Sequence, residues 1–99
     1  MMSRQYYVYF MTNAHDTTLY TGVTSDLQKR VYQHKAKAHH AAFTSRYKCS
    51  KLVYFEVFGD VELAIKREKS LKKWARAWKN ELVNKDNPQW IDLSEDWGL

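Results

Sequence analysis

Aromatic and β-branched residues near the start of the chain predict a β-hairpin. Its strands are expected at Tyr6–Thr12 and Leu19–Val23, because such residues favour extended backbone, and the polar residues Asn13–Thr17 form an ordinary hairpin connection. A third strand is predicted at Lys51–Phe58, where apolar residues follow one another almost without interruption. A run of this kind indicates a central strand that is buried on both of its faces.

A helix is predicted between the second and third strands. Ser25 followed three positions later by Gln28 is typical of a capping box, and Asp26 favours the positive end of a helix. This helix is expected to run to about Lys37. The residues that follow are less periodic, and a short second helix around Ala41–Arg46 is left open.

Two more helices are predicted after the third strand. Asp60 is placed to cap a helix from Val61 to about Lys73, and its continuation over Ala75–Lys85 ends before Pro88, which cannot continue a helix. The apolar residues of the tail are expected to fold back onto the domain. The element order is then β-β-α-(α)-β-α-α, which predicts an α+β fold with a mostly antiparallel three-stranded sheet flanked by helices.

Length and composition restrict the class of protein. Ninety-nine residues leave room for one domain, 1–99, and 44% hydrophobic residues are enough for a packed core despite 27% charged residues. The three glycines lie far apart, which excludes a glycine-rich phosphate-binding loop. A single cysteine excludes a disulfide framework, and neither a signal peptide nor a membrane-spanning apolar segment is visible. The sequence therefore predicts a soluble cytoplasmic protein.

Positive charge is concentrated in two blocks. The formal net charge is +5; residues 26–51 hold seven basic residues against one acid, and residues 62–79 hold seven against two. If the two blocks fold onto one face, they form the footprint that a polyphosphate partner requires. Ordinary solvated helix faces are the main alternative. An anionic membrane surface is a weaker one, because the apolar stripe of the second block is needed for the core.

Several residues stand out from the pattern around them. Glu68 interrupts the apolar stripe of its predicted helix, where a carboxylate must meet a cation, as in a structural ion pair, or line a site. Arg30 and His34 lie one turn apart at the edge of a buried helix face. Tyr20 and Gly22 share a face of the second strand, and a glycine within a strand often marks close approach by a ligand or another backbone.

These residues resemble the motifs of the GIY-YIG nuclease family, specifically its small single-domain bacterial members. Tyr7-Val8-Tyr9 stands at the first motif and Tyr20-Thr21-Gly22 at the second, and Arg30, His34 and Glu68 follow in the family's order. The resemblance covers nearly the whole chain. It departs from the family pattern at Tyr7, where the motif has glycine, and at Thr21, where the motif has isoleucine.

The resemblance implies metal-dependent hydrolysis of a nucleic-acid phosphodiester, with DNA as the expected substrate. It implies Tyr9 as the general base, with His34 accepting or orienting its proton and Tyr20 as the second choice. Arg30 would hold the phosphate oxygens with its planar fork of donors. Glu68 would bind one Mg²⁺ or Mn²⁺ ion.

The resemblance also implies a nucleic-acid interface. Gly22 would let the backbone approach the strand, and a late asparagine near the site is expected at Asn80, with Asn84 as the alternative. Because no residues remain for a separate targeting domain, targeting would come from this module, from a homodimer or from a protein partner. Basic side chains would bind the strand without sequence preference, and more weakly as salt rises. Those expected to do so are Lys29, Lys35, Lys37, Arg46, Lys48, Lys66, Lys69, Lys72 and Lys73.

Other functions remain open. A non-catalytic nucleic-acid-binding module could keep the same fold, because aromatic and basic side chains bind single strands by stacking and charge. A zinc site built from His34, His39, His40 and Cys49 is disfavoured, because their spacing does not match a tetrahedral frame. Cys49 is expected to be a small buried side chain rather than a nucleophile.

Overall fold

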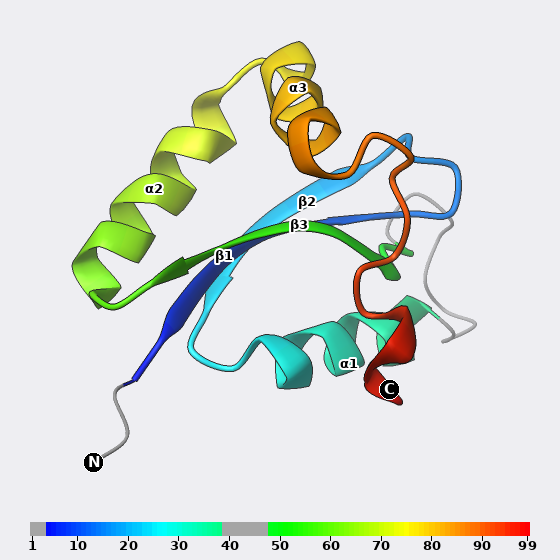
Figure 1. Ribbon diagram of the computed structural model, residues 1–99, viewed down its shortest axis with the longest axis horizontal. Coiled ribbons are helices and arrows are strands. Elements are labelled where there is room, and N and C mark those ends of the chain that lie inside the picture. Colours follow the sequence, from blue (N-terminus) through cyan, green and yellow to red (C-terminus); the bar gives the residue numbers. More distant parts are fainter. Residues whose placement is uncertain (1–3, 39–47) are drawn as a thin grey trace.

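The computed structural model describes residues 4–38 and 48–99. The described residues form a three-stranded antiparallel sheet and three α-helices in the order β-β-α-β-α-α, which confirms the predicted α+β class (Figure 1). The helix left open around Ala41–Arg46 lies outside the described residues. The elements are β1 (Tyr6–Thr12), β2 (Leu19–Thr24), α1 (Leu27–Ala38), β3 (Lys51–Phe58), α2 (Val61–Lys73), α3 (Arg76–Asp86) and a final 3₁₀ turn, η2 (Glu95–Trp97).

The central strand of the sheet is β1, which pairs with β2 on one side and with β3 on the other. The prediction that the third strand is central and buried on both faces is therefore wrong. Leu52, Val53 and Tyr54 of β3 are buried, but Phe55 and Val57 are 36% and 50% exposed. A continuous apolar run does not distinguish a central strand from an edge strand that other elements cover along part of its length.

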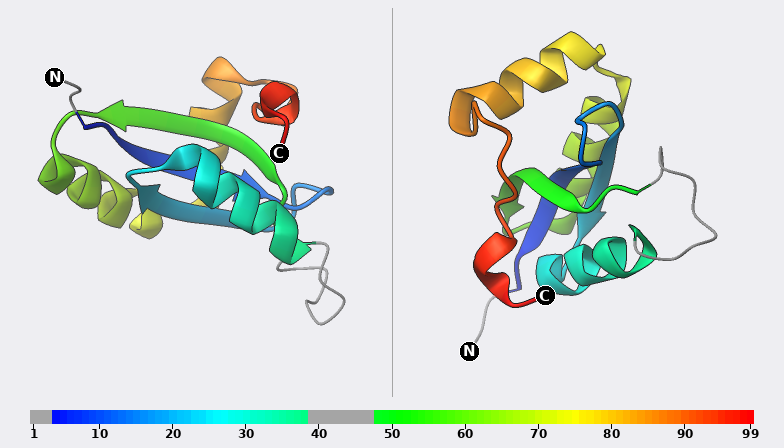
Figure 2. Two further views of the ribbon diagram at one scale, coloured as in Figure 1. Left: turned by 90° about the horizontal axis from the view of Figure 1, so that it is seen from below. Right: turned by 90° about the vertical axis from the view of Figure 1, so that its right-hand side faces the viewer.

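The sheet lies between two helical layers. Helix α1 covers one face, and α2 and α3 lie on the other (Figures 1 and 2). Successive side chains of a strand point to opposite faces, so Val8 and Phe10 of β1 pack on the side of α2 and α3, whereas Tyr9 and Met11 pack on the side of α1. The described basic residues of the two blocks lie mainly on α1 and α2. They are therefore separated by the sheet and do not share one face as the sequence suggested.

Acidic residues cap two of the helices. Asp26, and not Ser25, caps α1, because its Oδ1 accepts the N–H of Lys29 at 3.1 Å. The capping box predicted from Ser25 is replaced by this aspartate, which is one residue closer to the helix. Asp60 caps α2 as predicted, since its side chain accepts two N–H groups of the first turn.

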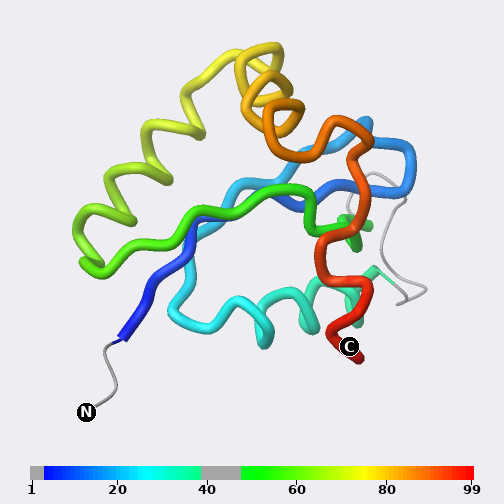
Figure 3. The backbone as a smooth tube through the Cα atoms, viewed as in Figure 1, coloured from blue at the N-terminus to red at the C-terminus, as the bar shows by residue number. Residues whose placement is uncertain are grey.

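Residues 87–99, here called the C-terminal strap, fold back onto the domain as predicted, and cross the sheet at β3 from the side of α3 to the side of α1 (Figure 3). Asp92 anchors the strap: its Oδ2 accepts from Nζ of Lys35 at 2.6 Å and its Oδ1 accepts from the N–H of Leu52 at 3.1 Å. The N–H of Leu93 donates to the carbonyl of Leu52 at 2.7 Å. The strap therefore ties α1 to the beginning of β3.

Candidate active site

Tyr9 lies at the centre of the predicted site. It faces α1 and is paired across the sheet with Gly22 of β2. A Cβ atom on Gly22 would lie 2.5 Å from Oη of Tyr9 and 2.8 Å from Cε1 of Tyr20. The missing side chain of Gly22 therefore provides the space for the phenol of Tyr9. Contact between Gly22 and a nucleic acid stays a prediction.

His34 of α1 is hydrogen-bonded to Tyr9, with 3.2 Å between Nε2 and Oη. Burial, together with the positive charges of Arg30 and Lys37, lowers the pKa of His34 to about 4. The imidazole is therefore neutral at neutral pH, and its Nε2 can accept the hydrogen bond from the phenol. Burial raises the pKa of Tyr9, although Arg30 opposes this change. Tyr9 and His34 thus form an uncharged pair.

Arg30 lies one turn before His34 on α1 and interacts with both tyrosines. Its interaction with Tyr9 raises the pKa of Arg30 above its usual value, and its Nη2 lies 3.5 Å from Oη of Tyr20. The rings of Tyr20 and His34 meet edge to face with 4.7 Å between their centroids. We call these four residues, Tyr9, Tyr20, Arg30 and His34, the tyrosine cluster. The structure brings together all four, as the resemblance to the family motifs implied.

A residue that sequence reasoning missed holds the guanidinium in place. Nη1 of Arg30 donates to Oε1 of Gln33 at 3.2 Å. Residues three apart on a helix are neighbours, so this spacing is the signal that could have identified Gln33. The guanidinium is therefore held by an amide of its own helix while it faces the phenols.

A hollow of about 350 Å³ opens beside the tyrosine cluster. Its walls combine the guanidinium, imidazole and phenol groups of the cluster with an additional lysine and with apolar side chains. A space with two cationic side chains on its wall suits a bound phosphate group. The lining residues are Thr18, Leu19, Tyr20, Arg30, His34, Lys37 and Cys49.

Glu68 lies on α2, on the opposite side of the sheet from the tyrosine cluster. It shares the buried stripe of α2 with Ala64 and Leu71, and Nζ of Lys72 lies 2.9 Å from its Oε2. The cation that the sequence requires beside this carboxylate is therefore Lys72, and a metal-binding role for Glu68 stays a prediction. This hydrogen-bonded pair raises the pKa of Lys72, and the nearby Tyr20 contributes to the same shift. This effect of Tyr20, a residue of the edge strand β2, is the link between the ion pair and the tyrosine cluster.

Glu68 is the residue that would hold a divalent ion. The described ranges 4–38 and 48–99 contain no group of three or more His, Cys, Asp or Glu side chains that could hold a metal by themselves. Mg²⁺ and similar hard ions often bind through one or two carboxylates, with water and substrate phosphate supplying the other oxygens. A single, largely buried carboxylate whose partner is a displaceable ammonium fits this type of binding.

The basic residues predicted to bind nucleic acid differ in their surroundings. Lys35 holds the C-terminal strap through Asp92 and also donates to the carbonyl of Ser50 at 2.9 Å, so its ammonium has a structural role. Arg46 lies outside the described residues. Lys72 is paired with Glu68. The other lysines predicted to contact nucleic acid are exposed or half-buried; they are Lys29, Lys37, Lys48, Lys66, Lys69 and Lys73.

The two candidate accessory asparagines make contacts outside the tyrosine cluster. Oδ1 of Asn80 accepts from Nε of Arg76 at 2.8 Å, and Oδ1 of Asn84 accepts from a tryptophan of the strap. Asn87 is buried, and its Nδ2 donates to the carbonyl of Val53 at 3.1 Å. Its amide fixes the start of the strap. An accessory role for Asn80 or Asn84 stays a prediction.

Cys49 is buried in the core beneath α1, as expected, and burial raises the pKa of its thiol. A thiol with a raised pKa is mostly protonated at neutral pH and is a poor nucleophile. The zinc alternative for Cys49 and His34 needs His39 and His40, which lie outside the described residues.

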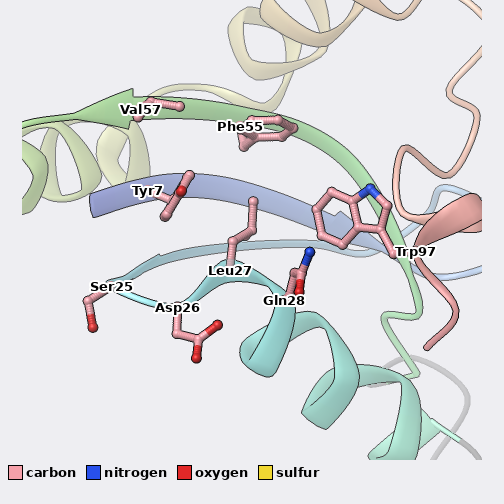
Figure 4. Close-up of a pocket in the computed structure, with 8 residues that line it drawn as sticks. All are labelled: Tyr7, Ser25, Asp26, Leu27, Gln28, Phe55, Val57 and Trp97. Carbon is pink, nitrogen blue, oxygen red and sulfur yellow. The ribbon is translucent and has the colours of Figure 1, made fainter. Parts of the chain in front are cut away.

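A second hollow lies at the N-terminal end of α1 and is separate from the tyrosine cluster (Figure 4). Side chains of β1 and β3 form one wall, and Trp97 of η2 faces them (Figure 4). The charged side chain on its wall is the acidic Asp26, so the hollow does not suit a phosphate. Its lining residues are Tyr7, Ser25, Asp26, Leu27, Gln28, Phe55, Val57 and Trp97.

The fold and the tyrosine cluster together define a class of protein. The profile of the GIY-YIG catalytic domain matches residues 5–81, and the chain therefore belongs to the GIY-YIG family. Domains of this family are typically endonucleases, so membership suggests nuclease activity and implies a nucleic-acid substrate. No helix within the described ranges is long and apolar enough to span a bilayer.

Within this family the chain is similar to proteins named UPF0213. A UPF0213 protein of Syntrophus aciditrophicus is 37% identical over 83 residues, which cover 84% of this chain and 93% of that protein. A UPF0213 protein of Streptococcus pyogenes is 42% identical over 74 residues, covering 74% and 77%. The solution NMR structure of a UPF0213 protein from Bacillus halodurans matches with a TM-score of 0.56 at 24% identity, covering 93% of this chain and 97% of that one. This structural match supports the fold.

Proposed function

We propose that this protein is a metal-dependent endonuclease that hydrolyses phosphodiester bonds in nucleic acid, with DNA as the expected substrate. The observation that carries the proposal is the contact between Tyr9 and His34 beside the guanidinium of Arg30. This arrangement combines a hydrogen-bonded proton acceptor with a fixed cation. Hydrolysis of a phosphodiester needs both, because a water must lose a proton while negative charge develops on the phosphate.

The proton path runs through Tyr9. Burial raises the pKa of Tyr9, and burial lowers the pKa of His34 to about 4, so a phenolate with a protonated imidazole is not a stable resting state. We propose instead a concerted relay, in which Oη of Tyr9 takes a proton from the attacking water while its own proton moves to Nε2 of His34. The negative charge of a bound phosphate favours the protonated imidazole, and thus favours the relay.

Arg30 would stabilise the phosphate as the water oxygen attacks. Its planar fork of donors suits two phosphate oxygens, and Gln33 keeps the fork oriented. The bond from phosphorus to the leaving oxygen breaks as the bond to the water oxygen forms. A divalent ion held by Glu68 would supply positive charge for the phosphate and the leaving oxygen. Tyr20 would position the water or the phosphate through its contact with Arg30.

A cleavage assay with purified protein tests the proposal. The substrates are single-stranded, duplex and branched DNA and single-stranded RNA, each with Mg²⁺, with Mn²⁺ and with a chelator. We expect metal-dependent products that Arg30→Ala and Glu68→Gln reduce by about a hundredfold or more, while Lys85→Ala, at an exposed position of α3 outside the predicted interface, keeps most activity. Full activity in the first two variants would remove these residues from the mechanism.

A non-catalytic binding module is the second candidate. The exposed lysines of α1 and α2 are as consistent with this module as with a nuclease, because surface charge can bind phosphates without any catalytic group. Filter binding with and without Mg²⁺, on the same substrates, distinguishes the two functions. Binding without products for every substrate and metal would support the module and contradict the nuclease.

A further inference from the structure

Glu68 and Lys72 form a close ion pair that is half buried. The side chain of Glu68 is 12% exposed and that of Lys72 is 54% exposed, with 2.9 Å between Oε2 and Nζ. Within the described ranges, the other lysines of α2, Lys66, Lys69 and Lys73, form no ion pair. Lys72 is therefore distinguished by its partner and not only by its charge.

The two side chains differ in what they can do after separation. Glu68 lies in the buried stripe of its helix, so its carboxylate cannot move into solvent without moving α2. Lys72 is long, flexible and more than half exposed, so its ammonium can leave by side-chain rotation alone. A largely buried carboxylate without a counter-ion is unfavourable, and Lys72 supplies that counter-ion in the metal-free protein.

A divalent ion and the ammonium compete for this carboxylate. Both bind through its oxygen lone pairs, and two cations within a few ångströms of each other repel strongly where water is partly excluded. We therefore expect an ion that binds Glu68 to displace Lys72. The displaced ammonium then lacks a partner, and Tyr20 of the tyrosine cluster lies within electrostatic range of it.

We infer that Lys72 is the resident counter-ion of Glu68, displaced when a divalent ion binds, and that its freed ammonium then binds a phosphate of the nucleic acid. This inference rests on the proposed function, because it needs Glu68 to hold the ion. It adds Lys72 to the site, paired first with Glu68 and then with a phosphate of the nucleic acid. It also makes metal and nucleic acid bind cooperatively, since each supplies a partner for a group that the other leaves unpaired.

Calorimetric titration with Mn²⁺ alone tests the first half of the inference. Lys72→Met removes the competing charge and keeps a similar length, and Lys73→Met on the same helix is the matched control. We expect Lys72→Met to bind Mn²⁺ about fivefold more tightly than the natural chain, Lys73→Met to bind within about twofold of it, and Glu68→Gln to lose binding. Lys72→Gln gives a second neutral variant if the methionine variant does not fold, as circular dichroism would reveal.

The second half is tested by repeating the titrations with a short phosphorothioate oligonucleotide, which resists hydrolysis. We expect the oligonucleotide to tighten Mn²⁺ binding to the natural chain about fivefold, and to have less than half of this effect on Lys72→Met. Equal Mn²⁺ affinity in Lys72→Met and the natural chain, with binding lost in Glu68→Gln, would overturn the inference and leave the proposed metal site intact. Unchanged binding in Glu68→Gln would contradict the metal site itself.

Discussion

The hydroxyl of Tyr9 occupies the space that a side chain at Gly22 would fill, with only 2.5 Å between Oη and the position of a Cβ. The two residues lie opposite each other on neighbouring strands. Tyr9 of the first motif can therefore take this position only because residue 22 of the second motif is a glycine. This relationship also keeps the phenol of Tyr9 fully buried beside the edge strand β2.

Gly22→Ala is expected to lower both activity and stability. The added methyl group overlaps Oη and Cζ of Tyr9, and a well-packed site that must absorb such an overlap loses about 1–3 kcal/mol. Urea unfolding measures the loss, and the cleavage assay measures the displaced phenol. Gly59→Ala is the control, because a Cβ at Gly59 meets no atom within 4 Å. Equal stability of the two variants would contradict the packing role of Gly22.

Tyr9→Phe is expected to reduce the cleavage rate by about a hundredfold or more while the fold persists, because it removes the proton relay but keeps the packed ring. The control is Tyr7→Phe, because the hydroxyl of Tyr7 donates to Oε1 of the exposed Gln5. Single-turnover cleavage rates compare the variants. A Tyr9→Phe protein as fast as Tyr7→Phe would leave His34 or Tyr20 as the group that activates the water.

His34 makes stability depend on pH. Its pKa falls from 6.5 to about 4 on folding, so between these values the unfolded chain binds a proton that the folded protein does not. Above pH 6.5 the imidazole is neutral in both states and does not reduce the unfolding free energy. As the pH falls from 6.5 toward 4, the unfolded chain takes up the proton and the unfolding free energy decreases. Within this range the slope approaches ~1.4 kcal/mol per pH unit, because the two states differ by about one proton, and the partial exposure of the imidazole limits the total decrease.

Urea unfolding from pH 7.5 to pH 4.5 measures this dependence. In His34→Gln, which keeps a hydrogen-bond acceptor for Tyr9 and cannot titrate, the curve should be flatter over this range. Asp92 does not confuse the comparison, because Lys35 and Ser94 hold its pKa below its usual value even though burial alone would raise it. Identical curves for the natural chain and His34→Gln would show that the imidazole is solvated.

Asp92→Asn is expected to destabilise the protein by about 2–4 kcal/mol, the range for breaking a hydrogen-bonded ion pair that is largely buried. The carboxylate accepts from Lys35, from the N–H of Leu52, and from both the N–H and Oγ of Ser94. Asp96→Asn, at an exposed position of η2, is the control and should change stability by less than about 0.5 kcal/mol. Thermal unfolding of the two variants compares them directly.

Much of the fold follows from local sequence. The three strands and the helix over Val61–Lys73 have the predicted bounds to within a residue, because their aromatic, β-branched and periodic patterns agree with the tertiary packing. The order of the strands did not follow, since the apolar run of β3 is the same whether the strand is central or at the edge. That order depends on how α1 and the C-terminal strap cover the faces.

The candidate site was predictable as a set of residues but not as a geometry. The resemblance to the family motifs implied that Tyr9, Tyr20, Arg30 and His34 lie together, and the four do form one cluster. Spacing could not show that Glu68 approaches from the other side of the sheet, because the crossing of helix and edge strand is set by packing over long sequence distances. The sequence also could not show that Lys35 holds the strap through Asp92, because it does not distinguish this lysine from those that face solvent.

The match to the family domain ends at residue 81, yet Asp92 grips Lys35, the immediate neighbour of His34 on α1. A fragment that ends at residue 81 would contain every residue with a proposed chemical role. It would lose Asp92, whose ion pair with Lys35 holds α1, the helix of Arg30 and His34, in place. Transplanting this module into another protein should therefore include the final dozen residues, and comparisons that consider the shared segment alone will overlook what keeps its imidazole aligned.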